Sequence, residues 1–379
     1  MNLMNYSKKV LCLLLCCLFV FSLPATAKTP LTEPEASAYI LIEKETGTVL
    51  AQKNETERRP MASITKLMTV LLILEDIGSG KISLNDEVTA SANASAMGGS
   101  QIYLKENEVM NVDTLLKSIF VASANDACIA MAEHLEGSEQ AFVARMNERA
   151  GELGLTDTAY KNPHGLDEDG HHSSAKDIAT LSRLVLSHPT TKTYTGIWQD
   201  HIRNGTFELT NTNKLIRYYD GATGLKTGST TNAGSCLSAS AKRNGMELIA
   251  VVLNSPTSEM RFTDAKRLLD YGFANYQTTS LTNPDEVFAQ ESVAYGKTDS
   301  VDLYPKELLT FLQEKEQETT PVRRVELYSL KAPLSEGSVA GKLIFEVDGE
   351  TVAETELIIK QHVPKQSFWD TLWQFFKVM

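Results

Sequence analysis

The chain has 379 residues, of which 42% are hydrophobic and 22% charged, with a net charge of −12 and a pI near 5.2. This apolar fraction is ordinary for a folded protein, which excludes a disordered or fibrous chain. The length is sufficient for one large domain and a smaller one, and the acidic balance argues against nucleic acid as a partner.

The first 27 residues have the features of an export signal. Lys8 and Lys9 precede an apolar run over residues 10–23, and Ala25-Thr26-Ala27 offers the small residues that a signal peptidase recognises. The apolar run is shorter than the roughly 20 residues that a membrane-spanning helix needs. We therefore expect export and cleavage after Ala27, with an uncleaved N-terminal anchor as the alternative.

Two cysteines, Cys128 and Cys236, lie outside this signal. They could pair in an oxidising compartment, but both lie among apolar or small residues, where buried free thiols are expected. The chain has no Cys-x-x-Cys motif and no His/Cys cluster. We therefore expect no structural zinc site, no other metal and no cofactor.

A predicted hairpin over residues 38–42 and 48–52 precedes the stretch Met61–Leu67, which opens an apolar run to Leu74. We predict a buried helix here with Ser63 on its first turn. Ser63 and Lys66 would then lie on one helix face, and burial would favour a neutral lysine that can take the serine proton. The helix dipole would also stabilise developing negative charge at Ser63.

This Ser-x-x-Lys spacing is a weak signal taken alone. It arises by chance in a long chain, and a helix-capping serine followed by a surface lysine would produce the same pattern.

Further along the chain, the patterns predict helices over residues 113–134, 138–153 and 174–187, with Asp177 as a cap or ion-pair partner. Strands over residues 235–242 and 246–253 flank the turn Arg243-Asn244-Gly245, and an amphipathic helix covers residues 261–276. His164, His171 and His172 are assigned to loop structure. The order predicts an α+β fold in which an antiparallel sheet with distant first and last strands carries a helical insert.

A change in the sequence pattern near residue 278, to short runs of alternating apolar and polar residues, predicts a second domain. Short alternating runs over residues 324–328, 342–347 and 351–359, the last two separated by Asp348-Gly349, indicate a small all-β domain, a sandwich. The tail places six large apolar side chains on one helical face, which suits a membrane surface but is too short to cross a bilayer. A terminal helix docked on the protein's own core is the alternative. The predicted division is therefore 1–27, 28–277, 278–363 and 364–379.

Two more motifs strengthen the prediction for Ser63. Ser123-Ala124-Asn125 and Lys226-Thr227-Gly228 follow Ser63-x-x-Lys66 in the order found in penicillin-binding proteins and class A β-lactamases. With these motifs, and with the stretches at residues 125–132, 164–167 and 261–262, the whole chain resembles the low-molecular-mass D-alanyl-D-alanine carboxypeptidases of the S11 serine peptidase family, the penicillin-binding protein 5 group.

The chemistry assigns each motif residue a task. Ser63 would attack a peptide carbonyl and become acylated, Lys66 would accept its proton, and Ser123 would relay a proton to the leaving amine. Lys226 would help to keep Lys66 neutral and attract a terminal carboxylate, and Asn125 would hold the substrate backbone.

Four neighbouring positions complete the predicted binding site. Thr227 would hydrogen-bond the same carboxylate, and Gly228 would let the strand approach the ligand. The resemblance implies an oxyanion hole from the backbone N–H groups of Ser63 and Ser229. It also makes Arg261 a second carboxylate contact, with a surface ion pair as an equal alternative.

The expected protein is an exported, peripheral enzyme on the outer face of the cytoplasmic membrane. It would remove the terminal D-alanine from peptidoglycan stem peptides through an acyl-enzyme, and β-lactam antibiotics such as penicillin would acylate it. A class A β-lactamase would need a glutamate that activates water, and no Glu-x-x-Leu-Asn follows Ser123. A non-catalytic envelope scaffold is the third possibility, against which the intact motifs count.

Overall fold

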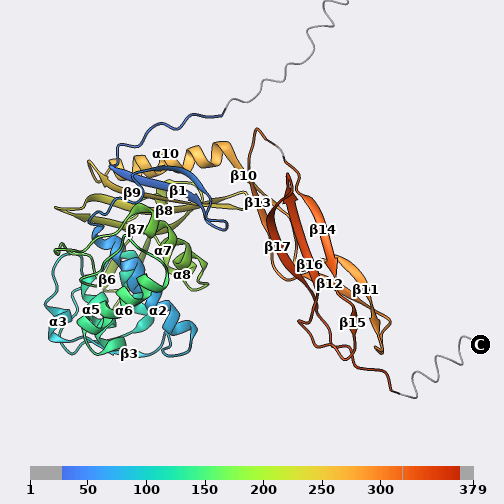
Figure 1. Cartoon of the computed structure of the whole chain (residues 1–379). Coiled ribbons are helices and arrows are strands. Elements are labelled where there is room, and N and C mark those ends of the chain that lie inside the picture. The colour runs from blue at the N-terminus through green and yellow to red at the C-terminus, as the bar shows by residue number, and fades with distance from the viewer. Residues whose placement is uncertain (1–27, 318, 368–379) are drawn as a thin grey trace, which may run out of the picture.

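The computed structural model describes residues 28–317 and 319–367, which form a larger N-terminal unit and an elongated C-terminal unit extending away from it (Figure 1). The predicted export signal and residues 368–379 of the predicted terminal helix lie outside the described residues. Residues 364–367, which the prediction included in that helix, are not helical. In the described part of the chain, no helix has the length and hydropathy required to cross a bilayer.

A five-stranded antiparallel sheet forms the centre of the N-terminal unit, in the order β2-β1-β9-β8-β7. Strand β1 pairs with β9, so strands from distant parts of the sequence join in one antiparallel sheet, as predicted. The predicted turn at Asn244-Gly245 joins β8 to β9. The strands are β1 (Ala38–Glu43), β2 (Val49–Lys53), β7 (Ala222–Thr230), β8 (Gly234–Arg243) and β9 (Met246–Ser255).

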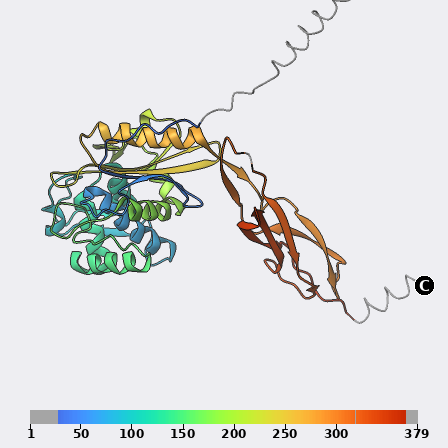
Figure 2. The same ribbon diagram turned by 45° about the horizontal axis from the view of Figure 1, so that its top comes forward.

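Both faces of this sheet are covered, because α10 lies on one face and the other long helices lie on the opposite face (Figures 1 and 2). Side chains alternate along β1: Ile40 and Ile42 join the core shared with the helical insert, whereas Tyr39 and Leu41 join the core beneath α10. This two-sided burial explains why β1 carries no charged residue before Glu43 at its end. The long helices are α2 (Lys66–Gly78), α4 (Val112–Val121), α5 (Asn125–Glu136), α6 (Glu139–Glu152), α7 (Ala175–Ser187) and α10 (Met260–Asn275).

Several helix starts follow from capping side chains that the sequence shows. Asn111, Ser138 and Ser174 accept hydrogen bonds from the backbone amides three residues further on. The shorter elements between the long helices are η1 (Ala62–Thr65), α3 (Ala92–Ser95), α8 (Thr191–Thr195), α9 (Leu215–Tyr218), and the hairpins β3 (Glu87–Thr89) with β4 (Val109–Asn111) and β5 (Gln199–Ile202) with β6 (Phe207–Thr210).

The prediction of a single helix over residues 113–134 is wrong. The segment forms two helices, α4 and α5, with a break at residues 122–124. Ser123 in the break has a left-handed φ of 62°. Ser100 lies in a distant loop, and its carbonyl accepts a hydrogen bond from the backbone N–H of Asn125 at 2.7 Å. A contact from outside the segment therefore holds the break, and the apolar pattern continuing on both sides hides it in the sequence.

The predicted helix at Ser63 is also different in detail. Ser63 lies on the short 3-10 turn η1, and α2 begins only at Lys66.

The C-terminal unit contains only strands in its described residues, so the predicted all-β character is confirmed. Its main sheet has the order β14-β16-β17-β12-β11-β15, and β10 pairs with β13 in a separate ribbon that leads out of α10. The predicted boundary at residue 278 falls inside β10. The strands are β10 (Tyr276–Ser280), β11 (Ala289–Ala294), β12 (Ser300–Pro305), β13 (Thr310–Glu314), β14 (Val322–Leu327), β15 (Leu330–Lys331), β16 (Val339–Val347) and β17 (Glu350–Ile359).

Candidate active site

Ser63 and Lys66 face each other where the helical layer meets the sheet. Ser63 is half-buried on η1, and its neighbour Ala62 has a left-handed φ of 50°. Lys66 has no exposed surface, and its Nζ lies 2.9 Å from Ser63 Oγ. A strained backbone beside a serine in contact with a buried amine is typical of a reactive site.

The amine of Lys66 has three oxygen neighbours, which together determine what it can do. Besides Ser63 Oγ, its Nζ donates to Asn125 Oδ1 at 2.7 Å and to the carbonyl of His164 at 2.6 Å. Burial lowers the pKa of Lys66 to about 8. A neutral amine has two N–H groups and one lone pair, and the amide and carbonyl oxygens can only accept. When Lys66 is neutral, its lone pair is therefore left for the Ser63 hydroxyl.

The break between α4 and α5 supplies the second motif. Ser123 is 3% exposed and Asn125 is 2% exposed, so both are buried, and Asn125 is in contact with Lys66. The Asn125 amide nitrogen donates to the carbonyl of Gly98 at 2.7 Å, while its oxygen accepts from Lys66. Both sides of this amide are therefore occupied, which fixes its orientation.

Strand β7 supplies the third motif at the edge of the sheet. Lys226 is 2% exposed, and its Nζ donates to the carbonyl of Thr227 at 3.1 Å. Burial, and then the nearby charge of Lys66, lower the pKa of Lys226 well below its ordinary value. The Thr227 hydroxyl donates to the hydroxyl of Thr212 at 2.7 Å.

Gly228 is required because η1 packs directly on β7. A Cβ at this position would lie 2.7 Å from the carbonyl oxygen of Met61 and 3.1 Å from the amide nitrogen of Ser63. Any side chain here would push the serine turn away from the strand. The glycine thus sets the distance between Ser63 and the sheet.

The last two predicted residues flank this strand. Ser229 is exposed on β7. Arg261, in the first turn of α10, is 8% exposed and donates from Nη1 to the carbonyl of Gly228 at 2.9 Å. This burial contradicts the surface ion pair considered for Arg261 and places its guanidinium beside the Lys-Thr-Gly strand. Within the described residues, the buried Nε of Arg261 has no hydrogen-bond partner.

The histidine loop contributes to the site through its backbone, which the sequence did not indicate. Burial lowers the pKa of His164 to about 3 and that of His171 to about 4, so both imidazoles are neutral at physiological pH. The carbonyl of His164 reaches Lys66 because Gly165 follows it with a φ of 90°, where a Cβ would lie only 2.0 Å from the carbonyl oxygen of Ala62. The stretch at residues 164–167 marked this loop in the sequence but gave no sign that its backbone contacts Lys66.

The other titratable groups play smaller parts. Cys128 and Cys236 are buried and unpaired, as predicted, and burial raises the pKa of their thiols to about 12 and about 11. Asp177 accepts from the backbone of Asp157 and the hydroxyl of Thr158, so it joins a loop to α7. Across residues 28–317 and 319–367, no three His, Cys, Asp or Glu side chains are placed to hold a metal ion.

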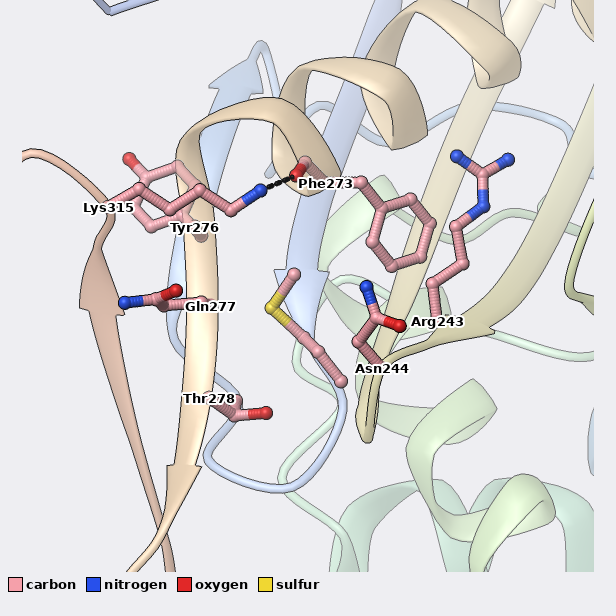
Figure 3. A pocket seen from close by; sticks show the side chains of 8 residues that line it. Arg243, Asn244, Phe273, Tyr276, Gln277, Thr278 and Lys315 are labelled. Atoms are coloured by element: carbon pink, nitrogen blue, oxygen red, sulfur yellow. Dashed lines mark hydrogen bonds between the residues drawn. The ribbon is translucent and has the colours of Figure 1, made fainter. Parts of the chain in front are cut away.

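A separate cavity of about 450 Å³ lies at the junction of the two units (Figure 3). It shares no residue with the Ser63 site, and the ammonium of Lys315 on its wall donates to the carbonyl of Phe273 at 2.6 Å. The lining consists of Arg243, Asn244, Met246, Phe273, Tyr276, Gln277, Thr278 and Lys315.

Known proteins share both units of this chain. The D-alanyl-D-alanine carboxypeptidase (peptidase S11) family profile matches residues 24–257, and the profile of the penicillin-binding protein 5 C-terminal domain matches residues 276–365. The chain belongs to the S11 family of D-alanyl-D-alanine carboxypeptidases.

Individual relatives cover most of this carboxypeptidase. D-alanyl-D-alanine carboxypeptidase DacF of Bacillus subtilis is 41% identical over 339 residues, which are 88% of this chain and 87% of the relative. Penicillin-binding protein 5 from Haemophilus influenzae superimposes with a TM-score of 0.70 at 32% identity, covering 89% of this chain and 99% of that structure. Ampicillin-bound penicillin-binding protein D2 from Listeria monocytogenes has a TM-score of 0.59 at 31% identity, with coverages of 64% and 100%.

The contact between η1 and β7 yields a first prediction. In Gly228→Ala, the added methyl group meets Met61 and Ser63 backbone atoms and displaces the serine. We expect D-alanine release from a D-Ala-D-Ala peptide to fall about 100-fold, the size of effect that a misplacement of about 1 Å produces. Gly196→Ala is the control, because nothing lies within 4 Å of a Cβ at Gly196. A Gly228→Ala rate within about twofold of the parent would contradict the prediction.

Proposed function

We propose that this carboxypeptidase removes the terminal D-alanine from peptidoglycan stem peptides through an acyl-enzyme on Ser63. The observation that carries the proposal is the arrangement at Lys66, whose two N–H groups have carbonyl-type acceptors and whose third neighbour is the Ser63 hydroxyl. That arrangement prepares a general base for a serine nucleophile without any histidine.

Acylation begins when Ser63 Oγ attacks the carbonyl carbon of the penultimate residue and passes its proton to Lys66 Nζ. The backbone N–H groups of Ser63 and Ser229 stabilise the oxyanion. The C–N bond then breaks, and the amine of the leaving D-alanine takes a proton that Ser123 relays from Lys66. Water afterwards attacks the ester, which releases the shortened peptide and restores the Ser63 hydroxyl.

Recognition of the substrate terminus falls to the sheet side of the site. Lys226, the Thr227 hydroxyl and Arg261 bind the terminal carboxylate, and Asn125 holds the substrate backbone. Because burial lowers the pKa of Lys226, an arriving carboxylate favours its protonated form and creates the ion pair as it binds. The same site accepts a β-lactam in place of the peptide, and the relative from Listeria monocytogenes with bound ampicillin supports this part of the proposal.

The enzyme acts in the cell envelope, where its substrate is. We place it on the outer face of the cytoplasmic membrane, exported by residues 1–27 and held peripherally by the aromatic face predicted for the tail. The sequence pattern of these two segments supports this location.

The acyl-enzyme is tested by intact mass. After brief exposure to benzylpenicillin, we expect the parent to gain the mass of one opened antibiotic molecule and Ser63→Ala to gain none. The adduct should be long-lived, because no Glu-x-x-Leu-Asn element is present to activate water against it. No adduct on the parent would favour the scaffold hypothesis, whereas rapid turnover of benzylpenicillin would indicate a β-lactamase.

The role of Lys66 as the general base is tested by the pH dependence of the reaction. Lys66 must be neutral to accept the serine proton, so kcat/KM should rise with pH until about 8, the pKa to which burial lowers Lys66. The measurement is D-alanine release between about pH 6 and 10. A rising limb near the ordinary histidine value of about 6.5 would contradict the assignment to Lys66.

The location is tested by truncation. Deleting residues 368–379 leaves the backbone contact between Gln366 and Tyr295 in place. We expect the truncated enzyme to move from the membrane fraction to the soluble fraction while it releases D-alanine at the parent rate, because only the aromatic anchor is removed. Unchanged membrane association would refute the anchor.

A further inference from the structure

The loop of residues 98–104, which connects α3 to β4, crosses the start of α5 and touches Asn125 twice. The backbone N–H of Asn125 donates to the carbonyl of Ser100, and its side-chain nitrogen donates to the carbonyl of Gly98, each at 2.7 Å. Gly99 has a φ of 77°, and a Cβ there would lie 2.7 Å from the Asn125 amide nitrogen. The loop therefore lies as close to Asn125 as a backbone can.

Asp126, the next residue on α5, holds this loop from below. Its carboxylate is 1% exposed and accepts from the backbone N–H of Ile102, at 3.1 Å to one oxygen and 3.2 Å to the other. It also accepts from the N–H of Leu104 at 2.9 Å. A carboxylate with backbone N–H donors at a helix start is a stable arrangement that needs no cation.

Arg203 holds the same loop from the solvent side. Its guanidinium donates to the carbonyls of Ile102 at 2.7 Å and Tyr103 at 3.3 Å, and it forms an ion pair with Glu108 at 2.7 Å. The loop is thus fixed on two sides, and Gly98 is fixed with it.

The position of Gly98 matters because the two ends of an amide have nearly the same shape. If the Gly98 carbonyl moved away, the Asn125 side chain could rotate and present its NH₂ group to Lys66. Two donors would then face each other, and a neutral Lys66 would turn its lone pair toward that NH₂ group. The lone pair would no longer point at Ser63.

We propose that Asp126 is a positioning residue for the reaction: by fixing the loop of residues 98–104 it fixes the Asn125 amide, and through that amide it directs the Lys66 lone pair at Ser63. This inference rests on the proposed function. Asp126 makes no hydrogen bond to the serine or the lysine, so its positioning effect passes through Asn125. Its charge also acts on Lys66 directly and opposes the lowering of the lysine pKa by burial, an effect that is independent of Asn125 and therefore the same in both backgrounds of the test below.

A double-mutant cycle tests that route. Asp126→Asn replaces an accepting oxygen with an NH₂ group facing backbone donors. The Asp126→Asn substitution is made in the unmutated parent and in the Asn125→Ala variant. For each protein, the rate of acylation by benzylpenicillin is measured by intact mass, and the rate of D-alanine release is measured separately. We expect a loss of about tenfold or more in the parent but of less than about twofold in Asn125→Ala, because the amide through which Asp126 acts is absent there.

The matched control is Glu43→Gln. Glu43 is also fully buried, and its carboxylate accepts from the backbone N–H groups of Glu45 and Thr46, far from the site on β1. With Glu43→Gln, the rates of acylation and of D-alanine release should stay within about twofold of those of the protein without this substitution, in both the parent and the Asn125→Ala background. Equal losses from Asp126→Asn in the two backgrounds, or no loss in the parent background, would overturn the positioning role.

Two further measurements keep the outcomes separate. If Asp126→Asn does not fold, as thermal unfolding would show, Arg203→Gln loosens the loop from its solvent side. It should reduce acylation only where Asn125 is present, and an equal loss in both backgrounds would again overturn the inference. If the unmutated enzyme neither releases D-alanine nor gains the mass of the antibiotic, the proposed function itself is rejected.

Discussion

Lys66 has no exposed surface, and its side-chain nitrogen must therefore find every hydrogen-bond partner inside the protein. The three partners come from η1, from α5 and from the loop that carries His164. Three segments distant in sequence must meet at one atom, which requires tight backbone turns. Left-handed residues at Ala62, Ser123 and Gly165 provide those turns. Left-handed backbone at these three positions thus serves to satisfy one amine without water.

A second buried lysine, Lys226, faces the same interior from the sheet. The charge of Lys66 lowers the pKa of Lys226, in addition to the effect of burial. The helical layer therefore holds the amine suited to be a base, and the sheet holds the amine suited to meet an anion. In the proposed function, binding and chemistry would be coupled through the charge on this pair, because the protonation of Lys226 that an arriving anion favours would in turn favour the neutral form of Lys66.

Much of the fold was predictable because its signals are local. The capped starts of α6 and α7, the turn at Asn244-Gly245 and the alternating strands of the C-terminal unit follow from short patterns. The motif residues were predictable from their types and order. The break at Ser123 and the supporting contacts from Asp126 and the His164 carbonyl were not, because each is set by a partner dozens of residues away. Periodicity describes which face of a segment is apolar, and it carries no information about where a tertiary contact interrupts that segment.

Strand β7 lies at the end of its sheet, and such a strand ordinarily invites pairing with another chain and so promotes aggregation. Here the carbonyls of Gly224 and Gly228 accept hydrogen bonds from the side chains of Asn213 and Arg261. Along β7 only Ser229 is fully exposed. Side chains next to Ser63 and further along the strand therefore also shield the edge of the sheet. With these acceptors occupied, β7 offers fewer free backbone groups to a strand of another chain, which lowers the tendency of the protein to join into larger sheets.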